Sequence, residues 1–158
     1  MSEDEVIKVG NTAPDFTLKD QDENEVKLTD FKGKFVLLSF HPLAWTKVCA
    51  DQMKSLEANF ERFEKLNTVA LGMSVDTVPS KSAWAKELGI TRTRLLSDFW
   101  PHGSTAKSLG IFRDKNGISE RANIIIDTNQ QVAFVKVYSI RELPDIDEII
   151  KFLEEANK

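Results

Sequence analysis

The chain has a single cysteine, Cys49, and this scarcity excludes several kinds of site. One cysteine cannot form an internal disulfide, a Cys-x-x-Cys redox pair or a multi-cysteine zinc site. The chain has two histidines, His41 and His102, and neither has a metal-ligand spacing to Cys49, so we expect no metal. The glycines form no phosphate-binding loop, and we expect neither a nucleotide nor a flavin as cofactor.

Long apolar runs and an excess of basic charge are also lacking. No apolar run approaches the ~20 residues that a membrane-spanning helix needs, and no basic segment followed by an apolar one marks a signal peptide. The formal net charge of -4 gives no electrostatic reason to expect nucleic acid or a membrane surface as a partner. Because an unpaired thiol suits a reducing compartment, we expect a cytoplasmic protein.

The chain does contain an alternation of strand and helix patterns, without repeats or a linker. Period-2 and continuous apolar patterns predict strands at residues 16–18, 26–28, 35–40, 68–75, 94–97, 122–127 and 132–137. Apolar residues at helical spacing predict helices from Cys49, at 80–88, before Gly110 and from Pro144. This order predicts one α/β domain over residues 1–158, with a thioredoxin-like fold: a central mixed β-sheet flanked by helices, and an N-terminal β-hairpin.

Cys49 lies where a buried strand gives way to a helix. The apolar strand Phe35–Phe40 leads into a loop that starts at His41, and the helical pattern starts near Cys49. Sheets of α/β proteins place ligand sites in such strand-end loops. The positive end of a helix dipole also favours a thiolate, which is the nucleophilic form of cysteine. The alternative is a buried, inert cysteine that packs as a small hydrophobe.

Three neighbours of Cys49 allow either a structural or a chemical role. Thr46 is expected to cap the helix by accepting an amide hydrogen bond, and from there its hydroxyl can also hold a substrate oxygen. Pro42 terminates the strand and can shield the sulfur from water. His41 is either a titratable partner of the thiol or, as we favour, a satisfied structural group.

An arginine at the end of a central strand can reach a neighbouring loop. Arg121 begins the strand 122–127, where it would stabilise a thiolate and hold a polar oxygen. The residues alone do not distinguish this arginine from Arg113 or Arg141. Packing in the core, rather than in an apolar pocket wall, is expected of the aromatic residues Trp45, Phe99 and Trp100.

The run Pro42-x-x-x-Thr46-x-x-Cys49 resembles the signature of peroxiredoxins, the thiol peroxidases of the thioredoxin superfamily. Residues 11–16 are similar to the N-terminal segment of this AhpC/TSA family, and residues 96–103 to its one-cysteine AhpE-type branch. The resemblance implies a thiol-dependent peroxidase that reduces hydrogen peroxide or organic hydroperoxides through a cysteine sulfenic acid.

The resemblance also implies roles for individual residues. Cys49 becomes the peroxidatic nucleophile, with Thr46, Pro42 and Arg121 completing the catalytic group. Gln52 stands where many members have glutamate, and it is expected to support the arginine. We expect His41, Gln52 and Trp45 to contact the substrate or to lie behind the catalytic residues and support them.

With one cysteine, the sulfenic acid needs an external thiol reductant: a thioredoxin-like protein, a glutaredoxin or a small thiol. The resemblance implies at least a homodimer or a larger homo-oligomer. Two other functions remain open: a non-enzymatic redox relay that passes oxidation from Cys49 to a partner protein, and an interaction module with an idle thiol.

Overall fold

The computed structural model describes residues 5–158 and contains a seven-stranded sheet of order β2-β1-β5-β4-β3-β8-β9. Its strands are β1 (Thr17–Lys19), β2 (Glu25–Lys27), β3 (Phe35–Phe40), β4 (Thr68–Ser74), β5 (Arg94–Ser97), β8 (Arg121–Ile126) and β9 (Val132–Tyr138). A separate small sheet pairs β6 (Phe112–Arg113) with β7 (Ile118–Ser119). The helices are α1 (Lys47–Ala58), α2 (Phe60–Lys65), α3 (Val78–Leu88), α4 (Ser104–Ser108) and α5 (Ile146–Ala156), and a 3-10 turn η2 covers Leu28–Phe31.

The sheet is mixed, as the sequence predicted. Strands β3, β4 and β5 run parallel to one another, whereas β8 is antiparallel to β3 and β9 is antiparallel to β8. The N-terminal hairpin β1–β2 is present and joins the sheet through an antiparallel contact with β5. Because β3, β4 and β5 are parallel, their carboxyl ends lie at one edge of the sheet, where the following loops meet.

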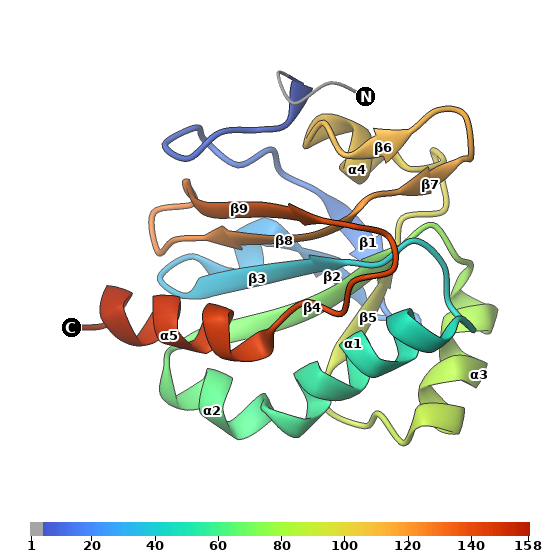
Figure 1. Ribbon diagram of the computed structural model, residues 1–158, viewed down its shortest axis with the longest axis horizontal. Helices are drawn as coiled ribbons and strands as arrows, with labels where there is room; N and C mark the ends of the chain where they lie inside the picture. Colours follow the sequence, from blue (N-terminus) through green and yellow to red (C-terminus); the bar gives the residue numbers. More distant parts are fainter. Residues whose placement is uncertain (1–4) are drawn as a thin grey trace.

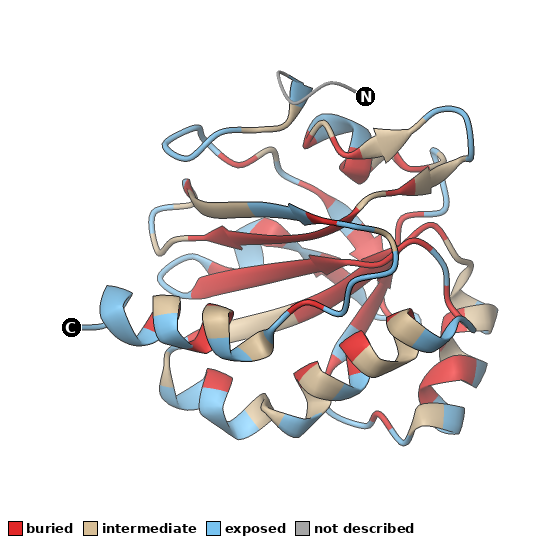
Figure 2. Cartoon of the chain, in the orientation of Figure 1, coloured by how far each residue is buried: buried red, intermediate tan, exposed pale blue. Residues whose placement is uncertain are grey.

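Alternate side chains of β3 pack into two different cores, as the period of a strand requires. Leu37 belongs to a cluster with residues of α1, α3 and α5. Val36 and Leu38 belong to a second cluster that includes residues of the N-terminal segment and of α4. Helices α1, α2, α3 and α5 therefore cover one face of the sheet, and α4 with the β6–β7 hairpin lies on the other side (Figure 1). The central strands are buried, while the helices are buried mainly on the side toward the sheet (Figure 2).

Three helix boundaries differ from the sequence prediction. The helix expected to run on from Cys49 is interrupted at Asn59, which ends α1, and α2 follows as a separate helix. Pro79 lies within the first turn of α3 because Thr77 caps that helix, its hydroxyl accepting from Ser80 N at 3.4 Å. The prediction that the last helix begins at Pro144 was wrong, because the Asp145 carboxylate caps the helix by accepting from Asp147 N at 3.0 Å, and α5 begins at Ile146.

The β6–β7 hairpin was missed because each of its strands is only two residues long, which is too short for a periodic pattern. Among residues 5–158, every helix is too short or too polar to cross a membrane.

Candidate active site

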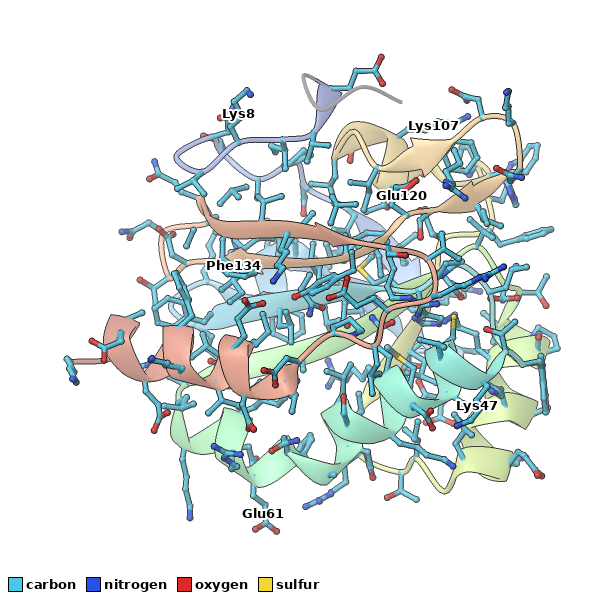
Figure 3. All side chains as sticks on the ribbon, in the orientation of Figure 1. Lys8, Lys47, Glu61, Lys107, Glu120 and Phe134 are labelled. Carbon is cyan, nitrogen blue, oxygen red and sulfur yellow. The ribbon has the colours of Figure 1, made fainter. Side chains whose placement is uncertain are left out.

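Cys49 is the third residue of α1 and is 1% exposed. Thr46, at the N-cap, has an extended backbone, and the first hydrogen bond of the helix runs from Ala50 N to Thr46 O at 2.9 Å. The amides of residues 47–49 therefore point out of the helix start without a carbonyl partner inside it. Figure 3 labels Lys47 on this first turn. The sulfur thus lies at the end of α1 that attracts negative charge.

Arg121 contacts the sulfur directly. Its Nη1 donates to Cys49 Sγ at 3.3 Å and to Gln52 Oε1 at 2.7 Å. Its Nε and Nη2 both donate to Ile140 O, at 3.0 and 2.7 Å, and the residue is only 2% exposed. The guanidinium is held from both sides, so a permanent positive charge is fixed beside the thiol.

The sheet register explains why this arginine reaches the thiol. Strand β8 is antiparallel to β3 with Phe40 opposite Ala122, so the start of β8 lies beside the end of β3. Arg113 instead donates to Glu120 Oε1 through Nε, and Arg141 is exposed. The structure thus separates three arginines that the sequence left as alternatives.

Gln52, on the turn of α1 after Cys49, holds the guanidinium in place. Its Nε2 donates to Ser39 Oγ at 2.8 Å and to Phe40 O at 3.1 Å, while its Oε1 accepts from Arg121. The side chain is 2% exposed, so these bonds are made away from water. Because an amide rather than a carboxylate accepts from Arg121, this contact leaves the positive charge of the guanidinium uncompensated.

The hydrogen bond of the Thr46 hydroxyl differs from the helix cap that the sequence predicted. Although it occupies the N-cap, its hydroxyl makes no capping bond and donates instead to Leu43 O at 2.9 Å. The hydroxyl turns back onto its own loop because a carbonyl three residues earlier is within reach. An oxygen that donates to a carbonyl still has lone pairs with which to accept a hydrogen bond.

The loop that carries Thr46 is shaped by two further residues. Pro42 is buried at its start. Trp45 has φ +70°, an uncommon conformation for a bulky side chain, and its Nε1 donates to Ser80 Oγ at 3.1 Å. The predicted core packing of three aromatic residues was wrong, since the exposed fractions are 56% for Trp45, 44% for Phe99 and 78% for Trp100. These residues lie in loops beyond the strand ends, where no element within residues 5–158 covers them.

His41 and Lys81 form a second polar pair, and both are 0% exposed. Lys81 Nζ lies 3.2 Å from His41 Nε2, and the imidazole packs against the Trp84 ring at a centroid distance of 5.3 Å. Burial, followed by the nearby charge of Lys81, holds the pKa of His41 well below its usual value. Burial also lowers the pKa of Lys81 to about 7, although the charges of Asp76 and Cys49 oppose this shift. The expectation that His41 is fully satisfied was wrong, because its Nδ1 has no hydrogen-bond partner within the described chain.

Sequence reasoning missed Lys81. It precedes Trp84 and Ala85 on α3 at i+3 and i+4, and both of these are buried, so its position on the apolar face of the helix was a usable signal. A metal site finds no support in residues 5–158, where no group of three or more His, Cys, Asp or Glu side chains is placed to hold an ion.

Comparison with known proteins gives the family of this chain. Residues 9–135 match the AhpC/TSA family. Alkyl hydroperoxide reductase E of Mycobacterium tuberculosis is 38% identical over 141 residues, which cover 89% of this chain and 92% of that protein. The mitochondrial thioredoxin-dependent peroxide reductase of Drosophila melanogaster is 34% identical over 160 residues, or 94% of this chain and 66% of that protein.

A solved structure supports the same assignment. The reduced 2-Cys peroxiredoxin of Plasmodium vivax superposes with a TM-score of 0.86 at 33% identity, covering 94% of this chain and 81% of that one. The predicted thioredoxin-like fold is therefore confirmed. The chain belongs to the AhpC/TSA family, as the resemblance of its cysteine motif predicted, and its one cysteine lies at the start of α1 against Arg121.

Proposed function

We propose that the protein is a thiol-dependent peroxidase in which the Cys49 thiolate attacks a peroxide. The observation that carries this proposal is the 3.3 Å contact between Arg121 Nη1 and Cys49 Sγ at the start of α1. The guanidinium and the helix N-terminus both favour the anionic sulfur over the thiol. The relatives named peroxide and hydroperoxide reductases supply the substrate class, hydrogen peroxide or an organic hydroperoxide.

The first step transfers one oxygen to sulfur. The thiolate attacks the terminal oxygen of the peroxide, an S–O bond forms and the O–O bond breaks. Sulfur loses two electrons, and the leaving oxygen gains them and takes up a proton to become water or an alcohol. Thr46 Oγ1, which donates to Leu43 O, accepts a hydrogen bond from the peroxide, and Arg121 with the free amides of α1 stabilises the negative charge on the moving oxygen. Pro42, buried at the start of the loop, limits the access of water.

The second step requires a thiol from another molecule, because the chain has one cysteine. That thiol displaces water from the sulfenic acid to form a mixed disulfide, and a further thiol releases Cys49. We propose a thioredoxin-like protein, a glutaredoxin or a small thiol as reductant. Turnover compared among these three candidates, at equal thiol concentration, identifies the reductant.

Replacement of the sulfur tests the nucleophile. Cys49→Ser is expected to abolish peroxide consumption in the presence of thiol, and its matched control, Ala50→Ser, is expected to retain it. In the unaltered protein, one equivalent of peroxide should give one sulfenic acid at Cys49, detected by dimedone labelling and mass spectrometry. Peroxide consumption by Cys49→Ser would remove the proposed nucleophile. Labelling without turnover by any thiol would favour a redox relay instead.

We further propose that the enzyme acts in the cytoplasm as a homodimer or a larger homo-oligomer. An unpaired cysteine favours a reducing compartment. Large apolar side chains remain exposed on neighbouring loops at the catalytic end of the sheet: Leu43, Trp45, Phe99 and Trp100. A second copy that buries them would remove an exposed apolar patch. Sedimentation should show a multimer that Trp100→Lys weakens, whereas a monomer at all concentrations would overturn this assembly.

A further inference from the structure

One peptide group in the loop before α1 is hydrogen-bonded on both of its sides. The peptide that joins Leu43 to Ala44 donates through Ala44 N to Asp76 Oδ2 at 2.8 Å. The carbonyl of the same peptide, Leu43 O, accepts from Thr46 Oγ1 at 2.9 Å. Because β3 and β4 are parallel, the loops that follow them meet at the carboxyl edge of the sheet (Figure 1). Asp76, in the loop after β4, is thus connected to Thr46 through a single peptide unit.

The sheet holds Asp76 in place from two sides. Its Oδ2 accepts a second hydrogen bond from Ser74 Oγ at 2.6 Å, and its backbone carbonyl accepts from Ser97 Oγ at 2.6 Å. Ser74 is the last residue of β4 and Ser97 is the last residue of β5, and the two lie opposite each other in the parallel pairing of these strands. The position of the carboxylate is therefore set by two strands of the sheet and not by the loop that it contacts.

The two hydrogen bonds of this peptide strengthen each other. A bond from a peptide N–H to a carboxylate is charge-assisted, and it polarises the peptide so that the carbonyl oxygen becomes a better acceptor. Leu43 O can only accept, so the Thr46 hydroxyl must turn its hydrogen toward that carbonyl. The lone pairs of Thr46 Oγ1 then remain for a donor from outside the loop. Asp76 thus favours one orientation of a hydroxyl that could otherwise rotate.

We propose that Asp76 is a positioning residue that fixes Thr46 as a hydrogen-bond acceptor for the peroxide. This inference rests on the proposed function, in which Thr46 Oγ1 accepts from the O–H of the peroxide. Asp76 acts through the Leu43–Ala44 peptide and not on the reacting atoms. A hydroxyl that is held in the accepting orientation aligns the peroxide before the Cys49 thiolate attacks it, and such alignment lowers the barrier of the reaction.

Two rate constants of Cys49, measured at the same pH with hydrogen peroxide and with iodoacetamide, test the proposal. Both reactions use the thiolate, so their ratio does not depend on the ionised fraction of the sulfur, and only the first uses Thr46. Asp76→Ala should lower the ratio by roughly 10-fold. Asp76→Asn, whose amide oxygen can still accept from Ala44 N, should restore part of it. The control Asp114→Ala, an exposed aspartate in the turn between β6 and β7, should leave the ratio unchanged. An unchanged ratio in Asp76→Ala, including an equal slowing of both reactions, would overturn the proposal.

A double-mutant cycle shows whether the effect of Asp76 passes through Thr46. Thr46→Val lacks the hydroxyl and should lower the same ratio at least as much as Asp76→Ala does. Adding Asp76→Ala to Thr46→Val should then change the ratio little, because the hydroxyl that Asp76 positions is already gone. A further loss by the same factor would mean that Asp76 acts independently of Thr46, which contradicts the proposal. Absence of any sulfenic acid in the unaltered protein would instead overturn the proposed function, so the two failures are distinguishable.

Discussion

Two buried cations serve the Cys49 region, and they are held in opposite ways. Arg121 has a carbonyl, an amide oxygen and the sulfur as acceptors, so each of its three nitrogens donates at least one hydrogen bond. Lys81 has one partner, the imidazole of His41, whose other nitrogen has none within residues 5–158. A guanidinium stays charged at every pH that a protein tolerates, whereas a buried ammonium loses its proton readily. The comparison indicates that the charge of Arg121 is permanent, whereas the charge of Lys81 changes near neutral pH.

The largest effect is expected from removing the permanent charge. Arg121→Ala should lower the rate constant for sulfenic acid formation by about 10²-fold to 10³-fold, as loss of one charge-stabilising donor does elsewhere. The pH midpoint of Cys49 alkylation should rise, because the guanidinium no longer favours the thiolate. Arg121→Lys, which keeps a charge but loses the paired bonds to Ile140 O, should recover part of both effects. An unchanged pH profile for Cys49 alkylation in Arg121→Ala would show that the charge of Arg121 does not stabilise the thiolate.

The lowered pKa of Lys81 should make the free energy of unfolding depend on pH. The pKa of Lys81 in the folded protein, about 7, lies below its value of 10.5 in the unfolded chain, so the unfolded state binds more protons between these pH values. The stability of the unaltered protein should therefore rise as the pH increases from 7 toward 10. Lys81→Met has no amine at this position, so its stability does not include this pH dependence. The excess of its unfolding free energy over that of the unaltered protein should therefore shrink by a few kcal/mol across this range. Denaturant unfolding at several pH values measures the difference in unfolding free energy between the two proteins. A difference that stayed constant with pH would contradict a lowered pKa of Lys81 in the folded protein.

A smaller effect is expected where Gln52 holds Arg121. Gln52→Glu keeps an acceptor for the guanidinium but cannot donate to Phe40 O, so unfolding should require about 1–3 kcal/mol less free energy. The added carboxylate also compensates the charge of Arg121, so the alkylation midpoint of Cys49 should rise. Gln52→Leu removes all three side-chain hydrogen bonds of Gln52 without adding charge and separates the two effects. A lower midpoint in Gln52→Glu than in Gln52→Leu would show that the uncharged amide is not what keeps the guanidinium effective.

The smallest effect is expected from a charge on the surface. Burial alone would raise the pKa of Glu57, but bonds from Thr91, Thr93 and Arg92 lower it to about 2. This carboxylate should stabilise the fold above pH 4.5, and the contribution should disappear as the pH falls from 4.5 toward 2. Glu57→Gln should cost about 1 kcal/mol at neutral pH, since the group is largely solvated, and nothing at pH 2. A peroxidase rate that changed with Glu57→Gln would mean that distant charges, and not only the two buried cations, tune the thiol.

The sequence predicted the strands of the sheet and the position of Cys49 more completely than the loops and side chains around the sulfur. The strands Phe35–Phe40 and Arg121–Ile126 were recognisable because five of six residues in the first and four of six in the second are apolar. The position of Cys49 followed from the strand and helix patterns on either side of it. The choice of Arg121 required the pairing of β8 with β3, which brings Arg121 to a cysteine 72 positions earlier, and no local pattern carries that information.

The errors at the loops have a physical cause as well. The hydroxyl of Thr46 can accept from a helix amide or donate to a loop carbonyl, and its residue type does not decide between these two bonds. Trp45, Phe99 and Trp100 look like core residues by composition, yet they lie beyond the strand ends where nothing in the described chain covers them. Lys81 was overlooked because a lysine on a helix is usually solvated, and only its neighbours Trp84 and Ala85 mark the buried face.

The most direct test of the account is the state of the Cys49 sulfur at pH 7. Absorbance at 240 nm, taken as the difference between the unaltered protein and Cys49→Ser, reports the thiolate. We predict close to one thiolate per chain at this pH and its disappearance, with one sulfenic acid formed, after one equivalent of peroxide. A protein that showed no thiolate signal at pH 7 and reacted with peroxide no faster than a free thiol would contradict the account.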